Sequence, residues 1–206
     1  MTPRNAERAL YSDILNLSVA NYTYSQLKCI LGQFTQTLFI VDLLKEILTN
    51  HEAKDMLIRK ICHYENAEDI VDKLLLLKPE ELARQLIQGV PINRNTLTNY
   101  LSKENYSLRP LHNFFFTRDS SISLYDHLLI GKMASKVRQR ESMIMQAIFD
   151  FHPDLNVKTI NPVDYPGNHS NISIEGGDIQ IAREDITIIG IGARTSTQGV
   201  DFILNH

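Results

Sequence analysis

Apolar residues recur at helical spacing through most of the first half of the chain. The pattern predicts helices over residues 4–18, 24–33, 53–64 and 67–77, and another that begins at Pro79. Gly32 and Gly89 stand where two of these helices are expected to end, because glycine commonly follows the last helical turn. We therefore expect residues 43–105 to pack as a small helical bundle. The run 36–41 is β-branched and aromatic, and it predicts a short strand.

The pattern changes near residue 106, beyond which most of the glycines and most of the strand signals are found. The alternation predicts a hairpin over 122–130, hinged at Asp126, and a second hairpin over 178–191. Between them, residues 137–151 have helical spacing and 156–170 are expected to form a loop. The order strand, strand, helix therefore occurs once.

The same order begins a second time, because Thr195-Ser196-Thr197-Gln198 is a capping-box pattern that predicts the start of a helix directly after the second hairpin. Strands and helices that follow one another in this way indicate the α/β class.

An aromatic run ends abruptly in two charged residues at Asn113-Phe114-Phe115-Phe116-Thr117-Arg118-Asp119. Its length and aromatic content favour a buried strand. A charged pair at the end of a buried strand costs desolvation free energy unless each member finds a partner. The run therefore marks either a site built at a strand end or a loop that Arg118 and Asp119 merely cap.

Composition excludes several classes of function. The formal net charge of −3 over 206 residues argues against a nucleic-acid-binding protein, and no apolar run is long enough to span a membrane. Two cysteines and a polar amino terminus without a signal-peptide core favour a cytoplasmic protein. Both cysteines, Cys29 and Cys62, lie in helical apolar patterns, so we interpret them as buried small hydrophobes rather than nucleophiles. The histidines have no spacing that suggests a metal site.

Charged residues of both signs gather around the predicted strands and helix starts. Glu175 and Asp178 bracket two glycines, and with Asp119 they make three carboxylates, while Arg138 and Arg194 supply two guanidinium groups. An ionised acid can accept two parallel N–H bonds from a guanidinium, and an arginine can do the reverse for a carboxylate. A free amino acid with a cationic side chain matches both sets. Alternatively, the glycines form a plain turn and the arginines are solvated residues at helix starts.

Four motifs occur in an order and at separations that resemble the arginine deiminase family. They are Asn113-x-x-Phe116-Thr117-Arg118-Asp119, Arg138-x-x-Glu141, Glu175-Gly176-Gly177-Asp178 and Gly192-x-Arg194-Thr195. The resemblance implies a partial pentein fold, a five-bladed α/β propeller built from ββαβ modules. Residues 1–42 would be the remnant of a first module, 43–105 an inserted helical bundle, and 106–206 the second module and the start of the third.

The resemblance also implies a role for each matching position. Asp119 would grip the substrate guanidinium, and Glu175 would support both that group and a catalytic histidine. Asn113, Arg138 and Arg194 would hold the other end of the substrate, Phe116 would form a wall of the pocket, and Asp178 would complete the substrate-binding motif. The partner implied is L-arginine or a similar guanidino compound, and neither a cofactor nor a metal is expected.

One part of the family pattern is missing. The nucleophilic cysteine of the family lies in a late loop flanked by glycine and proline, and its histidine lies in a His-Leu-Asp motif; neither stretch occurs here. We expect this chain to be the amino-terminal half to two-thirds of a longer protein and to be inactive by itself. The alternatives are a non-catalytic guanidino-binding subunit and an amidinotransferase relative, with self-association or a complementing carboxyl-terminal half as possible partners.

Overall fold

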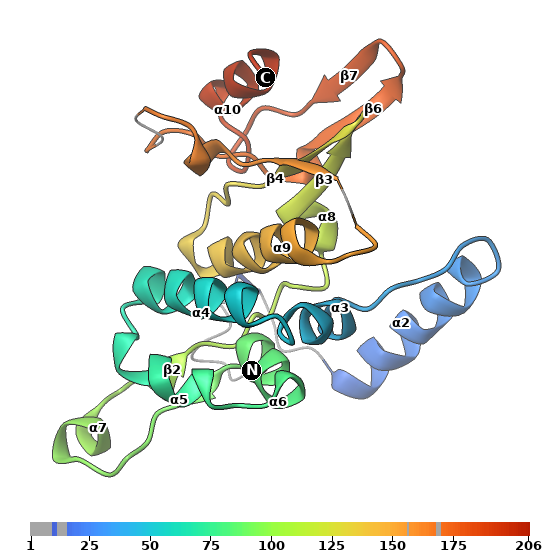
Figure 1. Cartoon of the computed structure of the whole chain (residues 1–206). Helices are drawn as coiled ribbons and strands as arrows, with labels where there is room; N and C mark the ends of the chain where they lie inside the picture. The colour runs from blue at the N-terminus through green and yellow to red at the C-terminus, as the bar shows by residue number, and fades with distance from the viewer. Residues whose placement is uncertain (1–9, 12–15, 156, 168–169) are drawn as a thin grey trace. The chain divides into compact units, whose positions relative to one another are not determined.

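The computed structural model describes residues 10–11, 16–155, 157–167 and 170–206, and the chain divides into two compact units after Asp42. The first unit contains α2 (Leu17–Leu31), shown in Figure 1. Asn16 caps its first turn by accepting hydrogen bonds from the N–H groups of Ser18 and Val19, and Gly32 ends it. The predicted helix over 24–33 and its stop are confirmed, with an earlier start. Most of the predicted helix over 4–18 lies outside the described residues.

The predicted strand over 36–41 is wrong. Residues 36–39 have no regular structure, and α3 (Ile40–Ile47) begins directly after them. Leu44 and Ile47 are buried on one side of this helix, together with Leu48 just beyond it. Burial at helical spacing therefore outweighs the weak strand preference of the β-branched residues.

The second unit begins with a group of helices, and the segment predicted as a bundle is mainly helical from His51 to Gln88. The elements are α4 (His51–Glu65), η2 (Glu68–Ile70), α5 (Val71–Leu75), α6 (Pro79–Gln88) and α7 (Leu97–Leu101). Pro79 occupies the first turn of α6, and Gly89 ends the helix at φ 91°, a conformation that few other residues adopt. Their core is made of fully buried aliphatic side chains: Leu57, Ile58, Ile61, Leu74, Leu82 and Leu86.

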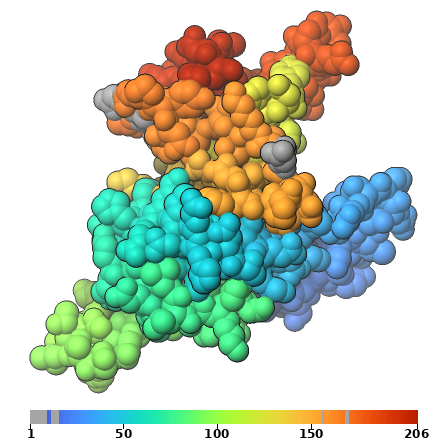
Figure 2. Space-filling model, in the orientation of Figure 1, coloured from blue at the N-terminus to red at the C-terminus, as the bar shows by residue number. Residues whose placement is uncertain are grey.

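A loop with α7 at its tip projects from the body of this unit (Figure 2). Its base is closed by β1 (Val90–Pro91), which pairs antiparallel with β2 (Tyr106–Leu108). Arg94 organises the loop, because its guanidinium donates to the carbonyl oxygens of Tyr100 and Glu104 and to the side chain of Asn105.

The first predicted hairpin is confirmed as β3 (Ser121–Leu124) and β4 (His127–Ile130), which are antiparallel and joined by a two-residue turn. The helix that follows is η3 (Lys136–Arg138) continuing into α9 (Gln139–Phe151), which lies alongside α4 (Figure 1). The loop predicted over 156–170 is partly wrong, because β5 (Lys158–Ile160) pairs parallel with β4. Three residues are too few for a period of two to be visible in the sequence.

The second hairpin is confirmed as β6 (Ile179–Arg183) and β7 (Ile186–Ile189), and α10 (Thr197–Leu204) follows it. The helix begins one residue later than expected, since Ser196 rather than Thr195 supplies the capping oxygen. A core of apolar residues joins this hairpin to the first one: Ile122, Leu129, Ile160, Ile174, Ile179 and Phe202.

The chain is therefore a mixed helix-and-sheet protein of the α/β type, in which ββαβ occurs once and ββα follows it. The assignment of these segments to modules of a five-bladed propeller stays a prediction. Within the described ranges, no helix has both the length and the apolar character needed to cross a bilayer.

Candidate active site

The aromatic run does not form the predicted strand. Residues 112–115 are turns, and α8 (Thr117–Ser120) is a single helical turn that leads directly into β3. The carbonyl of Asn113 accepts from the N–H of Phe116, and that of Phe116 accepts from the N–H of Asp119. Of the three phenylalanines only Phe114 is buried. These turns place Asp119 in α8, two residues before β3 begins, and its side chain is about one-quarter exposed.

The glycine pair of the Glu-Gly-Gly-Asp motif lies against this turn as η5 (Gly176–Asp178). A Cβ atom on Gly177 would stand 2.5 Å from Oδ1 of Asp119, and one on Gly176 would collide with the carbonyl oxygen of Arg118. A side chain at position 176 would push the two segments apart, and one at position 177 would displace the carboxylate of Asp119. The glycines therefore allow the two segments to approach each other closely.

Arg138 lies at the centre of the acidic residues, with 5% of its side chain exposed. Its Nη1 is 2.8 Å from Oδ2 of Asp119 and 3.5 Å from Oε2 of Glu175. Its Nη2 donates to the carbonyl of Asn113 at 3.4 Å and to Glu141 at 2.8 Å. One guanidinium therefore connects all four of these residues. Burial opposes the charge on Arg138, but the hydrogen bonds to Glu141 and Asp119 outweigh it and raise the pKa of the guanidinium.

Glu141 is a member of the site to which the sequence assigned no role. Its side chain is 1% exposed, and Nε of Arg138 approaches both of its oxygens, at 3.3 and 3.1 Å. Burial raises the pKa of Glu141 to about 7, although Arg138 acts against this rise, and the negative charges of Asp119 and Glu175 add to it. The signal in the sequence was the three-residue spacing from Arg138, which places both side chains on one side of the helix start.

Glu175 connects the buried part of the site to its exposed edge. Its Oε1 accepts from the N–H of Ala134 at 3.1 Å and lies 3.5 Å from Nη1 of Arg194. The backbone N–H of Glu175 donates to Oγ1 of Thr195, which ties the Glu-Gly-Gly-Asp turn to the residue after Arg194. The side chain of Arg194 is 44% exposed, so one guanidinium of the site faces solvent.

Asp119, Arg138, Glu175 and Arg194 are thus brought together from four segments of the chain. Three carboxylates, those of Asp119, Glu141 and Glu175, stand against two guanidiniums. When all five groups are ionised, the arrangement holds one negative charge in excess. Such a site favours a further cation.

The other predicted residues lie at different distances from this centre. Asn113 is buried and contributes its carbonyl oxygen to Arg138. Phe116 is half exposed and its ring packs against Phe115, with 4.0 Å between centroids. The carboxylate of Asp178 makes no ion pair with any part of the chain that the structure describes. Ligand contacts by these three residues stay predictions.

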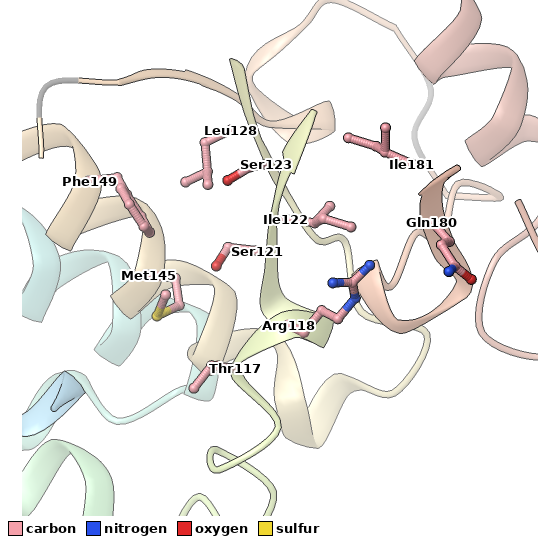
Figure 3. A pocket seen from close by; sticks show the side chains of 10 residues that line it. All are labelled: Thr117, Arg118, Ser121, Ile122, Ser123, Leu128, Met145, Phe149, Gln180 and Ile181. Carbon is pink, nitrogen blue, oxygen red and sulfur yellow. The ribbon is translucent and has the colours of Figure 1, made fainter. Parts of the chain in front are cut away.

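Arg118 precedes Asp119 but makes no ion pair with the acids within the described residues. Its Nη2 donates to the carbonyl oxygen of Ile179 at 2.7 Å, and its side chain lies beside Gln180 (Figure 3). It lines an open groove of about 580 Å³ along β3, whose walls come from α9 and β6. Neither Asp119 nor Glu175 lines that groove, so the groove is separate from the cluster of charges.

The thiol of Cys62 lies in an environment that suppresses its reactivity. Cys62 is fully buried within α4, and burial raises its pKa to about 11, with the nearby acids adding to the rise. Cys29 is exposed on α2 of the first unit, so the prediction that both cysteines are buried is wrong for Cys29. A thiolate is the reactive form, and burial keeps Cys62 protonated near neutral pH.

A comparison with known families agrees with the resemblance that the motifs indicated. The chain matches the family model described as arginine deiminase over residues 8–206. The matched range includes every residue of the charged cluster. This chain therefore belongs to the arginine deiminase family.

Proposed function

We propose that the charged cluster binds the guanidinium group of L-arginine, with Asp119 and Glu175 as its carboxylate partners. One observation carries the proposal: both acids already approach the same guanidinium nitrogen, Nη1 of Arg138. Their spacing therefore suits a planar cation. Charge-assisted bonds of this kind contribute about 1.5–3 kcal/mol each, which is enough to orient a small ligand.

The remaining residues would hold the rest of the ligand. Arg194 is half exposed beside Glu175, and an L-arginine whose head reached the acids could extend its carboxylate toward it. Arg138 and Asn113 would contribute to the same end, Phe116 would cover the aliphatic chain, and Asp178 would complete the motif. L-arginine carries opposite charges at its two ends, and this distribution matches acids on one side and guanidiniums on the other.

The reaction that we propose is hydrolysis of L-arginine to L-citrulline and ammonia, as in the family. A cysteine thiolate attacks the guanidinium carbon and ammonia leaves, after which water releases citrulline with a histidine as acid and base. Cys62 is buried and protonated, and Cys29 does not have the family's glycine- and proline-flanked setting. The thiolate and the histidine would therefore have to come from a complementing segment outside these 206 residues. The proposed location of the reaction is the cytoplasm.

Calorimetric titration with L-arginine tests the binding step. We expect Asp119→Asn and Glu175→Gln each to weaken binding by about 10- to 100-fold, because each removes a charged acceptor. Asp126→Asn is the matched control, since Asp126 is an exposed acid in the β3–β4 turn whose ion-pair partner among the described residues is His127. Absence of binding to the unmodified chain, or equal affinity in all variants, would rule the proposal out.

A citrulline assay on the same 206-residue protein tests the chemical step. We expect no turnover, and measurable citrulline would show that the chain does contain its nucleophile. The burial and raised pKa of Cys62 favour one second candidate, a non-catalytic subunit that binds guanidino compounds. A segment that contains the cysteine and the histidine can be supplied separately. If it restores activity, the chain is part of an enzyme rather than a non-catalytic subunit.

A further inference from the structure

Arg138 stands where the guanidinium of a ligand would need to bind. Oδ2 of Asp119 and Oε2 of Glu175 face its Nη1, and Oε1 of Glu175 accepts from Ala134. Of the four oxygens on these two acids, only Oδ1 of Asp119 makes no hydrogen bond within the described residues. A ligand that used both oxygens of Asp119 would therefore compete with Arg138.

We propose, on the basis of the function proposed above, that L-arginine binds by exchanging ion-pair partners with Arg138. In the free protein Nη1 of Arg138 pairs with the carboxylates of Asp119 and Glu175. On binding, the ligand's guanidinium takes over these two acids, and the released Nη1 pairs with the ligand's carboxylate. Arg138 is thus an internal competitor for the cationic end of the ligand and a partner for its anionic end.

The contacts around Arg138 fit such an exchange because they are unequal. Nε and Nη2 face Glu141 at 3.1 and 2.8 Å, and Glu141 is a buried neighbour three residues away. On the other side, Nη1 has one short contact, to Asp119, and one long contact of 3.5 Å, to Glu175. Asp119 is also the most exposed of the three acids. Glu141 would therefore retain Arg138 while the Nη1 end changes partner.

The exchange also keeps every buried charge paired. Breaking a buried ion pair without a replacement costs about 3–5 kcal/mol, so a cation that merely displaced Nη1 would bind poorly. L-arginine brings a carboxylate for the released nitrogen as well as a guanidinium for the acids. A guanidino compound without a carboxylate lacks that second group, so Arg138 would select against it.

Nitrogen NMR of the arginine side chains in the unmodified protein tests the exchange directly. The Arg138 signals are assigned by their loss in Arg138→Lys. We expect saturating L-arginine to shift the Nη1 resonance of Arg138 and to expose its protons to exchange, while Nε remains protected by Glu141. L-citrulline is the control ligand, since it has the same backbone groups but a neutral head, and it should leave Nη1 unchanged.

A comparison of two ligands gives a second test. Agmatine has the guanidinium and the chain of L-arginine but no carboxylate. We expect the unmodified protein to prefer L-arginine by tenfold or more, and Arg138→Gln to reduce this preference by about tenfold. Equal weakening of both ligands by Arg138→Gln would mean that Arg138 only maintains the structure, and it would overturn the exchange.

The two proposals fail differently. If calorimetry detects no binding of L-arginine to the unmodified protein, the proposed function itself is wrong. If L-arginine binds but the Nη1 signal of Arg138 does not change, only the exchange is wrong. Should Arg138→Gln not fold, the NMR measurement on the unmodified chain still decides between these outcomes.

Discussion

Arg138 and Glu141 form a buried ion pair three residues apart, in which Nη2 of the arginine lies 2.8 Å from Oε2 of the glutamate. The pair joins the start of α9 to the turns that carry Asp119 and Glu175. Burial within this pair raises the pKa of Glu141 to about 7. Stability and ligand binding should therefore both respond to changes at Glu141.

The raised pKa of Glu141 predicts a pH dependence of stability. Its ordinary value of 4.5 applies to the unfolded chain, and the folded value is about 7. Between these values the folded state binds more protons than the unfolded state, so the free energy of unfolding falls as pH rises from about 4.5 to 7. We expect Glu141 to contribute roughly 1–3 kcal/mol to this fall.

Urea denaturation of the unmodified chain and of Glu141→Gln between pH 5 and pH 8 measures this contribution. As pH rises, the free energy of unfolding should fall more for the unmodified chain than for Glu141→Gln. A difference that stays constant across the range would contradict the prediction. Glu52→Gln, at an exposed position in the first turn of α4, is a suitable control.

Adding a single methyl group at position 177 should weaken the binding of L-arginine. The new Cβ would lie 2.5 Å from Oδ1 of Asp119, so Gly177→Ala must displace that carboxylate. We expect L-arginine binding to weaken by at least tenfold, with about 1–3 kcal/mol lost in stability from overpacking. Gly192→Ala is the matched control, since a Cβ there meets no atom within 4 Å. Similar affinities for the two variants would show that Asp119 does not contact the ligand.

The buried guanidinium of Arg140 should lower the stability that the packing of α9 on α4 provides. Its side chain is 1% exposed, Nη2 donates to the carbonyl oxygen of Arg109, and Nε lies 3.3 Å from Oε1 of Glu65. Nε and Nη1 make no hydrogen bond among the described residues, and burial lowers the pKa of the guanidinium. The ion pair with Glu65 therefore carries an uncompensated desolvation cost.

We expect Arg140→Met to destabilise the protein by about 2–4 kcal/mol, because Glu65 is left without its cation. Adding Glu65→Leu should recover at least half of that loss, since the second substitution removes the unpaired acid. A double-mutant cycle by thermal or urea denaturation measures the coupling. Strictly additive effects of the two substitutions would show that Arg140 and Glu65 do not interact.

The two cysteines should differ strongly in reactivity. Cys62 is buried with a pKa of about 11, whereas Cys29 is exposed. Titration with a chromogenic disulfide at pH 8 should modify one thiol rapidly in the native protein and the second only after unfolding. Cys29→Ser should abolish the rapid phase, and Cys62→Ser should leave it intact. Rapid modification of both thiols in native protein would refute the burial of Cys62.

Sequence periodicity predicted the longer elements well, because a helix such as α4 or a hairpin such as β3–β4 repeats its pattern over many residues. It failed where elements are short or where burial depends on distant neighbours. The three residues of β5 show no alternation, and their pairing with β4 depends on a chain reversal through α9. The aromatic run looked like a strand, but only Phe114 is in the core.

By itself, the sequence determined in which motifs the charged residues lie and at what spacing, because residue type and local spacing can be read directly along the chain. Only the tertiary structure decided how those charges pair. Arg138 was expected to face the ligand's carboxylate, yet it binds Asp119 and Glu175, which are 19 and 37 residues away. The physical reason is that a buried guanidinium must find carboxylates nearby once water is excluded, and which acids are near is a property of the fold.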